Sequence, residues 1–251
     1  MKATTLFFAA VCASALSGGC KGKDGDPGPA GPAGQTLTGS ITGYATTYDE
    51  RGNRTAKSGT TVTIENQTPA LTTTTDADGR FQFTGLKMGT YNIIYSRTDY
   101  GTMKRFGVGH VGGGQPTYLG NQDLSVVATP VIVSFGFGAF NIQTWSLDYG
   151  VSLNIPPPSG RVVVYFSNTT SVSYSNFIFS SSAYGQLNGR TMYGSAYKSL
   201  LNSAGLAPGT VAYAIAYPVP LLPSSYTDQA TGLIVAPCLG APSSVQSFIV
   251  P

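Results

Sequence analysis

The chain of 251 residues is poor in charge, because only 10% of its residues are charged, 41% are hydrophobic and the formal net charge is +3. An ordinary soluble domain carries roughly 25% charged residues. The apolar content is too high for a disordered chain, and Lys and Arg form no cluster, which excludes a nucleic-acid-binding surface. The length allows one or two folded domains.

Residues 1–19 are predicted to be an export signal. Lys2 supplies a positive charge, residues 3–16 are uncharged and mostly apolar, and three small residues follow, Ser17, Gly18 and Gly19. The apolar stretch is too short for a bilayer-spanning helix, which needs about 20 residues. Cys20 comes directly after the small residues.

This arrangement resembles the lipobox of bacterial lipoproteins, in which the cysteine is diacylated and becomes the new N-terminus. The family prefers Leu three residues before the cysteine, whereas this chain has Ser17 there and Leu16 one place earlier. The resemblance implies lipidation at Cys20, attachment to a membrane through this lipid, and a place in the bacterial cell envelope as an outer-membrane lipoprotein that faces the periplasm or the cell surface. The alternative is an ordinary secretory signal cleaved near Gly19. With Cys12 removed and Cys20 lipidated, Cys238 is a lone thiol and no intramolecular disulfide can form.

Residues 20–35 are predicted to be a linker with a collagen-like repeat. Glycine recurs at every third position from Gly22 to Gly34, with prolines between. Only glycine fits at the axis of a collagen triple helix, but four triplets supply little trimer interface. We therefore favour an extended spacer at about 3 Å per residue over a collagen trimer.

Residues 36–128 are predicted to form a β-sandwich. Short runs of alternating apolar and polar residues are separated by turn sequences, and no stretch keeps apolar residues at helical spacing. Residues 49–53 and 76–79 are typical tight turns. The predicted strands are Gly39–Thr47, Thr60–Glu65, Arg80–Thr84 and Tyr91–Tyr95.

The same segment resembles the carboxypeptidase regulatory-like domain, a small transthyretin-like β-sandwich appended to many bacterial surface proteins. Its most specific signature is an Asp-Gly-x-Phe turn followed by Leu-x-x-Gly-x-Tyr, here Asp78–Phe81 and then Leu86–Tyr91. The resemblance implies that the domain is non-catalytic. We expect Phe81, Phe83, Leu86 and Tyr91 to point largely inward and Gly79 to occupy the turn. Two departures are a missing proline near Arg54 and residues 106–120, which look like a Gly-rich insertion.

Residues 129–251 are predicted to form a second β-sandwich with dense aromatic residues. The pattern at Leu206–Thr210, followed by Tyr213, resembles the corner of a fibronectin type III or immunoglobulin-like domain. A sandwich of this size needs about as many aromatic residues for its core, so we expect core positions for most of them, with a binding surface as the alternative. The predicted strands are Val131–Phe135, Val162–Phe166, Asn176–Ser180, Val211–Tyr217 and Gly232–Val235, with a helical turn at Lys198–Leu201. The five charged residues are Asp148, Arg161, Arg190, Lys198 and Asp228.

No catalytic, cofactor-binding or metal site is predicted. His110 is the only histidine, and no nucleophile elbow accompanies it. Residues 107–112 match the Gly-x-Gly-x-x-Gly dinucleotide fingerprint, but residues 113–116 cannot begin the required helix, so we expect a flexible loop. Asp76 and Asp78 lack the ligand set of a calcium loop, and a hairpin turn explains both.

The sequence thus indicates an all-β protein of two β-sandwich domains after a signal peptide and a short Gly-Pro linker. We interpret it as a cell-envelope lipoprotein with a structural or adhesive role, with no enzyme activity and no nucleic-acid partner. The second domain is the expected contact module for a glycan or protein ligand. One alternative function is that of a surface glycan-binding module, for which we would expect Trp145 and several tyrosines on one exposed face. A fimbrial subunit that exchanges strands also stays open, and would show a groove that lacks one strand.

Overall fold

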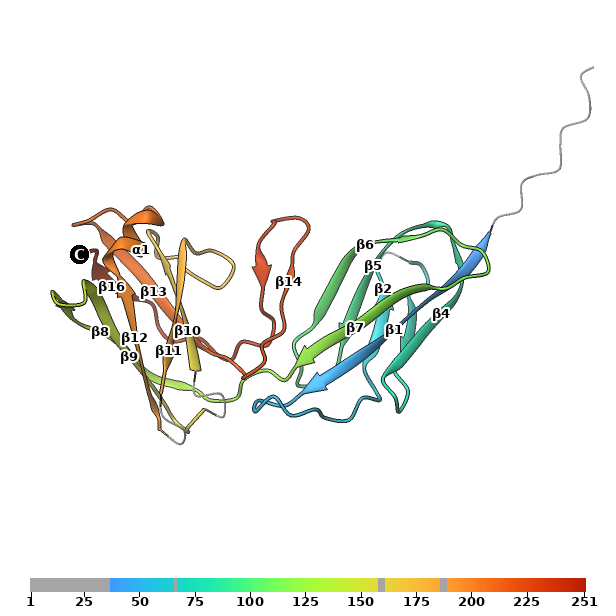
Figure 1. Cartoon of the computed structure of the whole chain (residues 1–251), viewed down its shortest axis with the longest axis horizontal. Coiled ribbons are helices and arrows are strands. Elements are labelled where there is room, and N and C mark those ends of the chain that lie inside the picture. Colours follow the sequence, from blue (N-terminus) through green and yellow to red (C-terminus); the bar gives the residue numbers. More distant parts are fainter. Residues whose placement is uncertain (1–36, 66, 158–160, 186–188) are drawn as a thin grey trace, which may run out of the picture. The chain divides into compact units, whose positions relative to one another are not determined.

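The computed structural model describes residues 37–65, 67–157, 161–185 and 189–251. Within these residues the protein is built of strands, with one short helix, α1 (Lys198–Ser203) (Figure 1). The predicted all-β fold class is therefore confirmed. The predicted signal peptide, the linker and Cys20 lie outside the described residues.

Two sheets form the first sandwich. One has three strands in the order β4-β1-β7, and the other has four in the order β3-β2-β5-β6. β1 and β7 run parallel, while all other neighbours are antiparallel. The strands are β1 (Thr38–Tyr48), β2 (Thr61–Ile64), β3 (Leu71–Thr74), β4 (Arg80–Lys87), β5 (Gly89–Ser96), β6 (Met103–His110) and β7 (Thr117–Ser125).

Alternation of apolar and polar residues along β4 places its large side chains between these sheets. Phe81, Phe83 and Leu86 are buried, as predicted, and Tyr91 packs at the edge of the same core. The preceding turn is closed by Asp76, whose carboxylate accepts backbone hydrogen bonds from residues 78 and 80. Gly79 in this turn has φ +83°, which a residue with a side chain rarely adopts.

The prediction of a flexible loop at residues 107–112 is wrong, because residues 107–110 form the end of β6. Gly107 has φ +67° and lies opposite a register shift in β5, so this glycine makes a bulge in a paired strand. The side chain of His110 is buried, and its Nδ1 lies 2.8 Å from Thr117 Oγ1. Most of the segment 106–120, which looked like a Gly-rich insertion, therefore belongs to the strands β6 and β7.

Residues 131–251 contain one seven-stranded antiparallel sheet in the order β16-β13-β10-β11-β12-β9-β8. The sheet curls so that β8 lies against β13 and β16, and its two halves enclose a core as two layers. We call it the curled sheet. Its strands are β8 (Ile132–Asn141), β9 (Ser146–Leu153), β10 (Arg161–Ser167), β11 (Phe179–Tyr184), β12 (Thr191–Tyr197), β13 (Val211–Pro218) and β16 (Gln246–Ile249).

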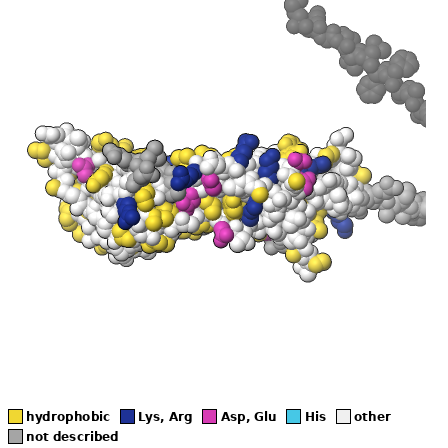
Figure 2. All heavy atoms as spheres, turned by 90° about the horizontal axis from the view of Figure 1, so that it is seen from below, with side chains coloured by type: hydrophobic (Ala, Val, Ile, Leu, Met, Phe, Trp, Pro, Cys, Tyr) yellow, Lys and Arg dark blue, Asp and Glu magenta, His cyan; other side chains and the backbone are white. Residues whose placement is uncertain are grey.

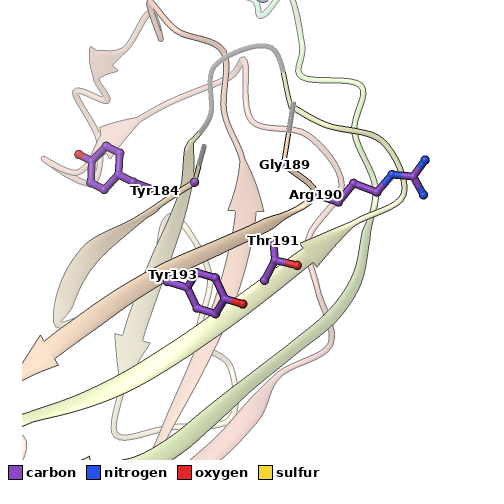
Figure 3. A pocket seen from close by; sticks show the side chains of 6 residues that line it. Tyr184, Gly189, Arg190, Thr191 and Tyr193 are labelled. Atoms are coloured by element: carbon purple, nitrogen blue, oxygen red, sulfur yellow. The ribbon is translucent and has the colours of Figure 1, made fainter. Parts of the chain in front are cut away.

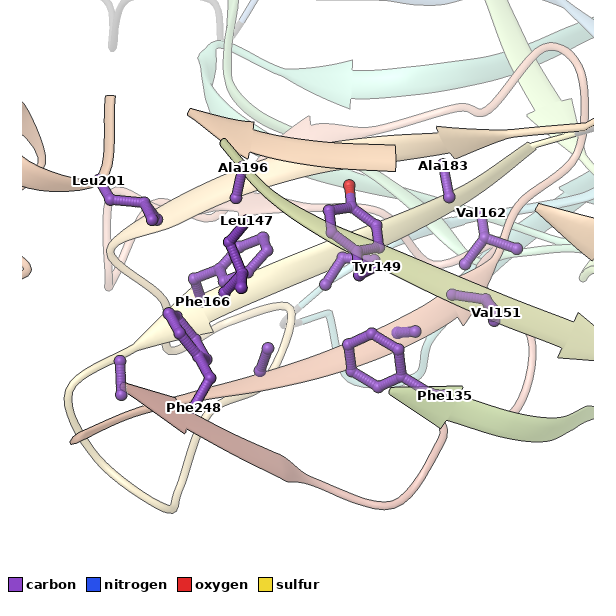
Figure 4. Close-up of a cluster of buried hydrophobic side chains, with 14 of the residues drawn as sticks. Phe135, Leu147, Tyr149, Val151, Val162, Phe166, Ala183, Ala196, Leu201 and Phe248 are labelled. Carbon is purple, nitrogen blue, oxygen red and sulfur yellow. The ribbon is translucent and has the colours of Figure 1, made fainter. Parts of the chain in front are cut away.

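Aromatic side chains fill much of the core inside the curled sheet (Figure 4). Tyr149 and Phe166 lie 6.0 Å apart between ring centroids. At the place where the sheet edges meet, the rings of Phe137 on β8 and Phe248 on β16 are 4.6 Å apart. These contacts close the core between the two edge strands.

The outer surface of β10 and β13 carries a second, smaller apolar cluster that includes Tyr165, Ile215 and Tyr217. Tyr213, the residue of the predicted corner, packs against this cluster. The predicted strand at Asn176–Ser180 is misplaced, because β11 begins only at Phe179. Residues 172–177 instead supply side chains that cover the cluster.

Residues 219–243 leave the curled sheet and hydrogen-bond to the first sandwich before the chain returns to β16. We call them the return segment. It contains the short hairpin of β14 (Tyr226–Thr227) and β15 (Ile234–Val235) (Figure 1). The backbone N–H of Ser125 donates to Ser224 Oγ at 3.0 Å, and that of Ala128 donates to the carbonyl of Cys238 at 3.0 Å. Cys238 is a buried free cysteine.

Candidate functional site

Four exposed aromatic side chains gather along β12 on the outside of the curled sheet. Tyr193 and Tyr197 alternate with buried Met192 and Ala196, so both tyrosines point outward. Tyr184 pairs directly with Tyr193 across β11 and β12 and therefore shares this face. The exposed fractions are 61% for Tyr184, 69% for Tyr193, 48% for Tyr197 and 61% for Trp145.

Trp145 joins this face at the turn between β8 and β9. Its backbone carbonyl accepts a 2.9 Å hydrogen bond from the N–H of Lys198, the residue after β12. Its ring and the side chain of Tyr197 line the same hollow. We call this outward surface of β11, β12 and β9, together with Trp145, the β12 face.

The central hollow of the β12 face has a volume of about 430 Å³ and lies beside Tyr193. The hollow exists because glycines line it where larger side chains would fill it. The Tyr193 ring lies over Gly150. At Gly138, the nearest atom to an added Cβ would be the carbonyl oxygen of residue 148, at 3.6 Å. Asp148 and Ser195 supply its polar lining. Small-ligand sites are typically concave and lined by aromatic or apolar side chains with a few polar groups, and this hollow has that composition.

Asp148 is held in place by hydroxyl donors. Ser195 Oγ donates to Asp148 Oδ1 at 2.6 Å, and Ser146 Oγ donates to the same oxygen at 3.0 Å. The hydrogen bond from Ser195, followed by those from Ser146 and Asn141, holds the pKa of Asp148 below its ordinary value of 3.8, although desolvation opposes the shift. The carboxylate is therefore ionised at neutral pH and keeps acceptor sites for further hydroxyl donors.

Two more hollows continue the central one along β12. The first, of about 540 Å³, is lined by Tyr184, Tyr193, Thr191 and Arg190, and we call it the Tyr184 hollow (Figure 3). In Figure 3 the Arg190 side chain extends away from both tyrosines. The other, which we call the Trp145 hollow, has about 360 Å³ and is lined by Thr144, Trp145, Tyr197, Lys198, Ser199 and Asn202.

The predicted and the observed site residues overlap only in part. For a glycan-binding module, Trp145 and several unspecified tyrosines were expected on one exposed face. Trp145 lies on such a face with Tyr184, Tyr193 and Tyr197, three tyrosines that the sequence did not single out, whereas Phe166 and Tyr165 belong to apolar clusters. Asp148 and Ser195 were not singled out as partners. They lie 47 positions apart, and only the pairing of β9 with β12 brings them together.

Charged groups are sparse on this molecule. On the face seen in Figure 2 the Lys and Arg side chains are scattered. In the part of the chain that the structure describes, no three His, Cys, Asp or Glu side chains gather as metal ligands would. Among the same residues, no helix has the length and apolar character needed to cross a membrane.

The fold and the face together define an all-β protein with an exposed aromatic surface. Residues 36–124 match the family model of the carboxypeptidase regulatory-like domain, which confirms the resemblance found in the sequence. A search of curated proteins finds no match to this chain.

Three solved structures are similar to this chain over part or most of its length. A type II cohesin–X-dockerin complex from Acetivibrio cellulolyticus is 20% identical, with a TM-score of 0.31. The match covers 36% of this chain and 58% of the other, so this chain spans just over half the length of that structure. A DUF3823 family protein from Parabacteroides merdae is 14% identical with a TM-score of 0.30, over 85% and 99%. BcpA, the major pilin subunit of Bacillus cereus, is 12% identical with a TM-score of 0.30, over 82% and 68%. Scores this low carry no argument about function.

Proposed function

We propose that this protein is a non-catalytic, adhesive lipoprotein of the bacterial cell envelope that binds glycans through the β12 face. The observation that carries the proposal is the row of exposed aromatic side chains, Tyr184, Tyr193, Tyr197 and Trp145, beside the ionised carboxylate of Asp148. Exposed apolar surface with a polar rim is typical of a binding site.

The chemistry of this face suits a sugar. The apolar C–H face of a pyranose packs on an aromatic ring, while its hydroxyl groups need hydrogen-bond partners. Asp148 accepts hydrogen bonds, and the Ser195 hydroxyl, whose one hydrogen is donated to Asp148, can accept a further one. Tyr193 and Tyr197 stand four residues apart on one strand, about 13 Å at 3.3 Å per residue. Such a distance exceeds one sugar ring, so the face suits a chain of several sugars.

Strand exchange of the fimbrial kind is supported less well. Its expected sign was a groove that lacks one strand, and the obvious place is the seam between β8 and β16, the edges of the curled sheet. There Phe137 and Phe248 contact each other and occupy the space between the edges. β8 also carries two register shifts against β9, which hinder addition of a regular strand.

The proposal is tested with residues 36–251, which form one compact unit. Screening this fragment on an array of bacterial, plant and animal glycans should give binding to linear oligosaccharides. Tyr193→Ala should abolish that binding because it removes the central ring. Gly138→Val should abolish it as well, because the new side chain fills the central hollow without a close contact. If the array gives no binding at all, the β12 face is not a glycan site.

A matched control is available in the first sandwich. Tyr118 is 63% exposed, similar to Tyr193, but lies on β7, far along the chain from the β12 face. Tyr118→Ala should leave glycan binding unchanged. Equal losses in Tyr118→Ala and Tyr193→Ala would mean that binding depends on exposed tyrosines in general and would contradict the assignment to this face.

The lipid anchor is part of the same proposal and rests on the sequence around Cys20. Cys20→Ala in the full chain should release the protein from the membrane fraction. It should also abolish incorporation of an alkyne-labelled palmitate. Unchanged labelling in this variant would show that the lipid is elsewhere or absent.

A further inference from the structure

The Trp145 hollow differs from the central hollow in the sign of its charge. The carboxylate of Asp148 lines the central hollow, whereas Lys198 is the one charged side chain among the described residues that line the Trp145 hollow. Lys198 is half-buried, and its Nζ lies 5.5 Å from the centre of the Trp145 ring. The hollow therefore presents an aromatic platform with an ammonium group beside it.

A second observation also points to a polar ligand in this hollow. Asn202 lines it, and Asn202 Oδ1 is buried with no hydrogen-bond partner in the described part of the chain. A buried amide oxygen without a donor is costly. This oxygen is shielded from solvent, so a hydroxyl group of a ligand supplies the missing donor once the half-buried Asn202 side chain turns toward the hollow.

We infer that the glycan bound along β12 is acidic, and that the sugar over Trp145 carries a carboxylate or a sulfate group that pairs with Lys198. This inference rests on the proposed glycan-binding function and adds the class and the orientation of the ligand. The acidic sugar stacks on Trp145, where Lys198 attracts it. A neutral sugar occupies the central hollow, because an anion there would lie against the carboxylate of Asp148 and be repelled.

The test compares acidic polysaccharides with their own neutralised forms. Residues 36–251 are titrated with hyaluronan, unsulfated chondroitin and keratan sulfate, in which an acidic sugar alternates with a neutral one, and with each of these after reduction of its carboxyl groups or removal of its sulfates. At least one acidic polymer should bind, and its neutralised form should bind about two- to fivefold more weakly, the range expected for one partly exposed charge pair. The kind of neutralisation that weakens binding tells whether the ligand group is a carboxylate or a sulfate.

Lys198→Gln supplies the specific variant and Lys87→Gln the matched control, because Lys87 is an exposed lysine on β4 that lines none of the three hollows. Lys198→Gln should bring binding of the acidic polymer down to that of its neutralised form, whereas Lys87→Gln should keep the difference. Equal losses in both variants would indicate non-specific attraction to cations and overturn the inference. Equal binding of acidic and neutralised polymers would overturn it while leaving the glycan-binding function intact. Absence of binding to every glycan, neutral ones included, would overturn the proposed function itself.

Discussion

Trp145 occupies a backbone position that favours glycine, because its φ is +53°. The position ends the turn that follows Asn141, whose Oδ1 accepts hydrogen bonds from the backbone N–H groups of Gln143 and Thr144. A large exposed ring at such a position gains little in packing, apart from an edge contact with Phe140 at 6.4 Å. A residue that adopts an unfavourable backbone conformation, with little packing to compensate, is typically a functional residue.

Trp145→Gly should therefore separate binding from stability. The free energy of unfolding should change by less than about 1 kcal/mol, because relief of the left-handed conformation offsets the entropy that glycine adds to the unfolded chain. Glycan binding should fall at least tenfold. Chemical denaturation and glycan titration of the same preparation measure both quantities. A loss of several kcal/mol would instead assign Trp145 a role in the fold.

Asp148 links stability to pH in a defined direction. Its pKa in the folded protein is held below 3.8, so its stabilising hydrogen bonds are fully present above pH 3.8 and are lost as the pH falls through the folded-state pKa. Asp148→Asn should be less stable than the unmodified protein near neutral pH. The difference should shrink once the pH drops below 3.8, as denaturant titrations at a series of pH values would measure. A difference that stays constant at low pH would contradict this.

Among the secondary-structure elements, the sequence predicted those strands best in which apolar and polar residues alternate regularly. β1, β10 and β13 were placed to within one residue of their ends, since regular alternation or dense β-branched residues mark them, whereas β4 continues three residues beyond the prediction. The short helix α1 was anticipated at Lys198–Leu201. β9 and β12 were missed because Gly150 and Gly194 interrupt their patterns.

Those interruptions have physical causes that a single strand does not reveal. A Cβ at Gly194 would lie 2.5 Å from the Tyr149 ring, so glycine there accommodates a buried tyrosine from the neighbouring strand. Gly150 lies under the Tyr193 ring, where an added Cβ would make only an ordinary contact at 3.7 Å. Trp145 was therefore predictable as a candidate binding residue, but the tyrosines beside it, the hollows and the Asp148–Ser195 pair depend on strand register.

β4 offers a direct test of the first core. Phe83 is 3% exposed, and its ring contacts Phe81 edge-on at 6.1 Å. Phe83→Ala should lower the free energy of unfolding by about 3–5 kcal/mol, as for other fully buried aromatic residues. Phe106→Ala, on the outer side of β6, is a comparison with a less buried ring. A loss below about 1 kcal/mol for Phe83→Ala would mean that β4 faces the other way.

At the scale of the whole molecule, the return segment is held by buried polar contacts. Ser224 is 7% exposed and accepts the backbone N–H of Ser125. Ser224→Ala should cost about 1–3 kcal/mol, because it leaves a buried donor unpaired. The exposed neighbour Ser225 is a matched control, and Ser225→Ala should change the free energy of unfolding by less than about 0.5 kcal/mol. Equal effects in denaturant titrations would show that the Ser125–Ser224 hydrogen bond contributes little.

The parallel pairing of β1 with β7 has a consequence for the order of events after synthesis. Ile41 is paired with Thr117, so the central strand of the three-stranded sheet obtains its second neighbour only after most of the first sandwich has been made. Closing so long a loop is slow. A chain that emerges N-terminus first would thus lack the pairing of β1 with β7 until the residues around Thr117 are free to fold.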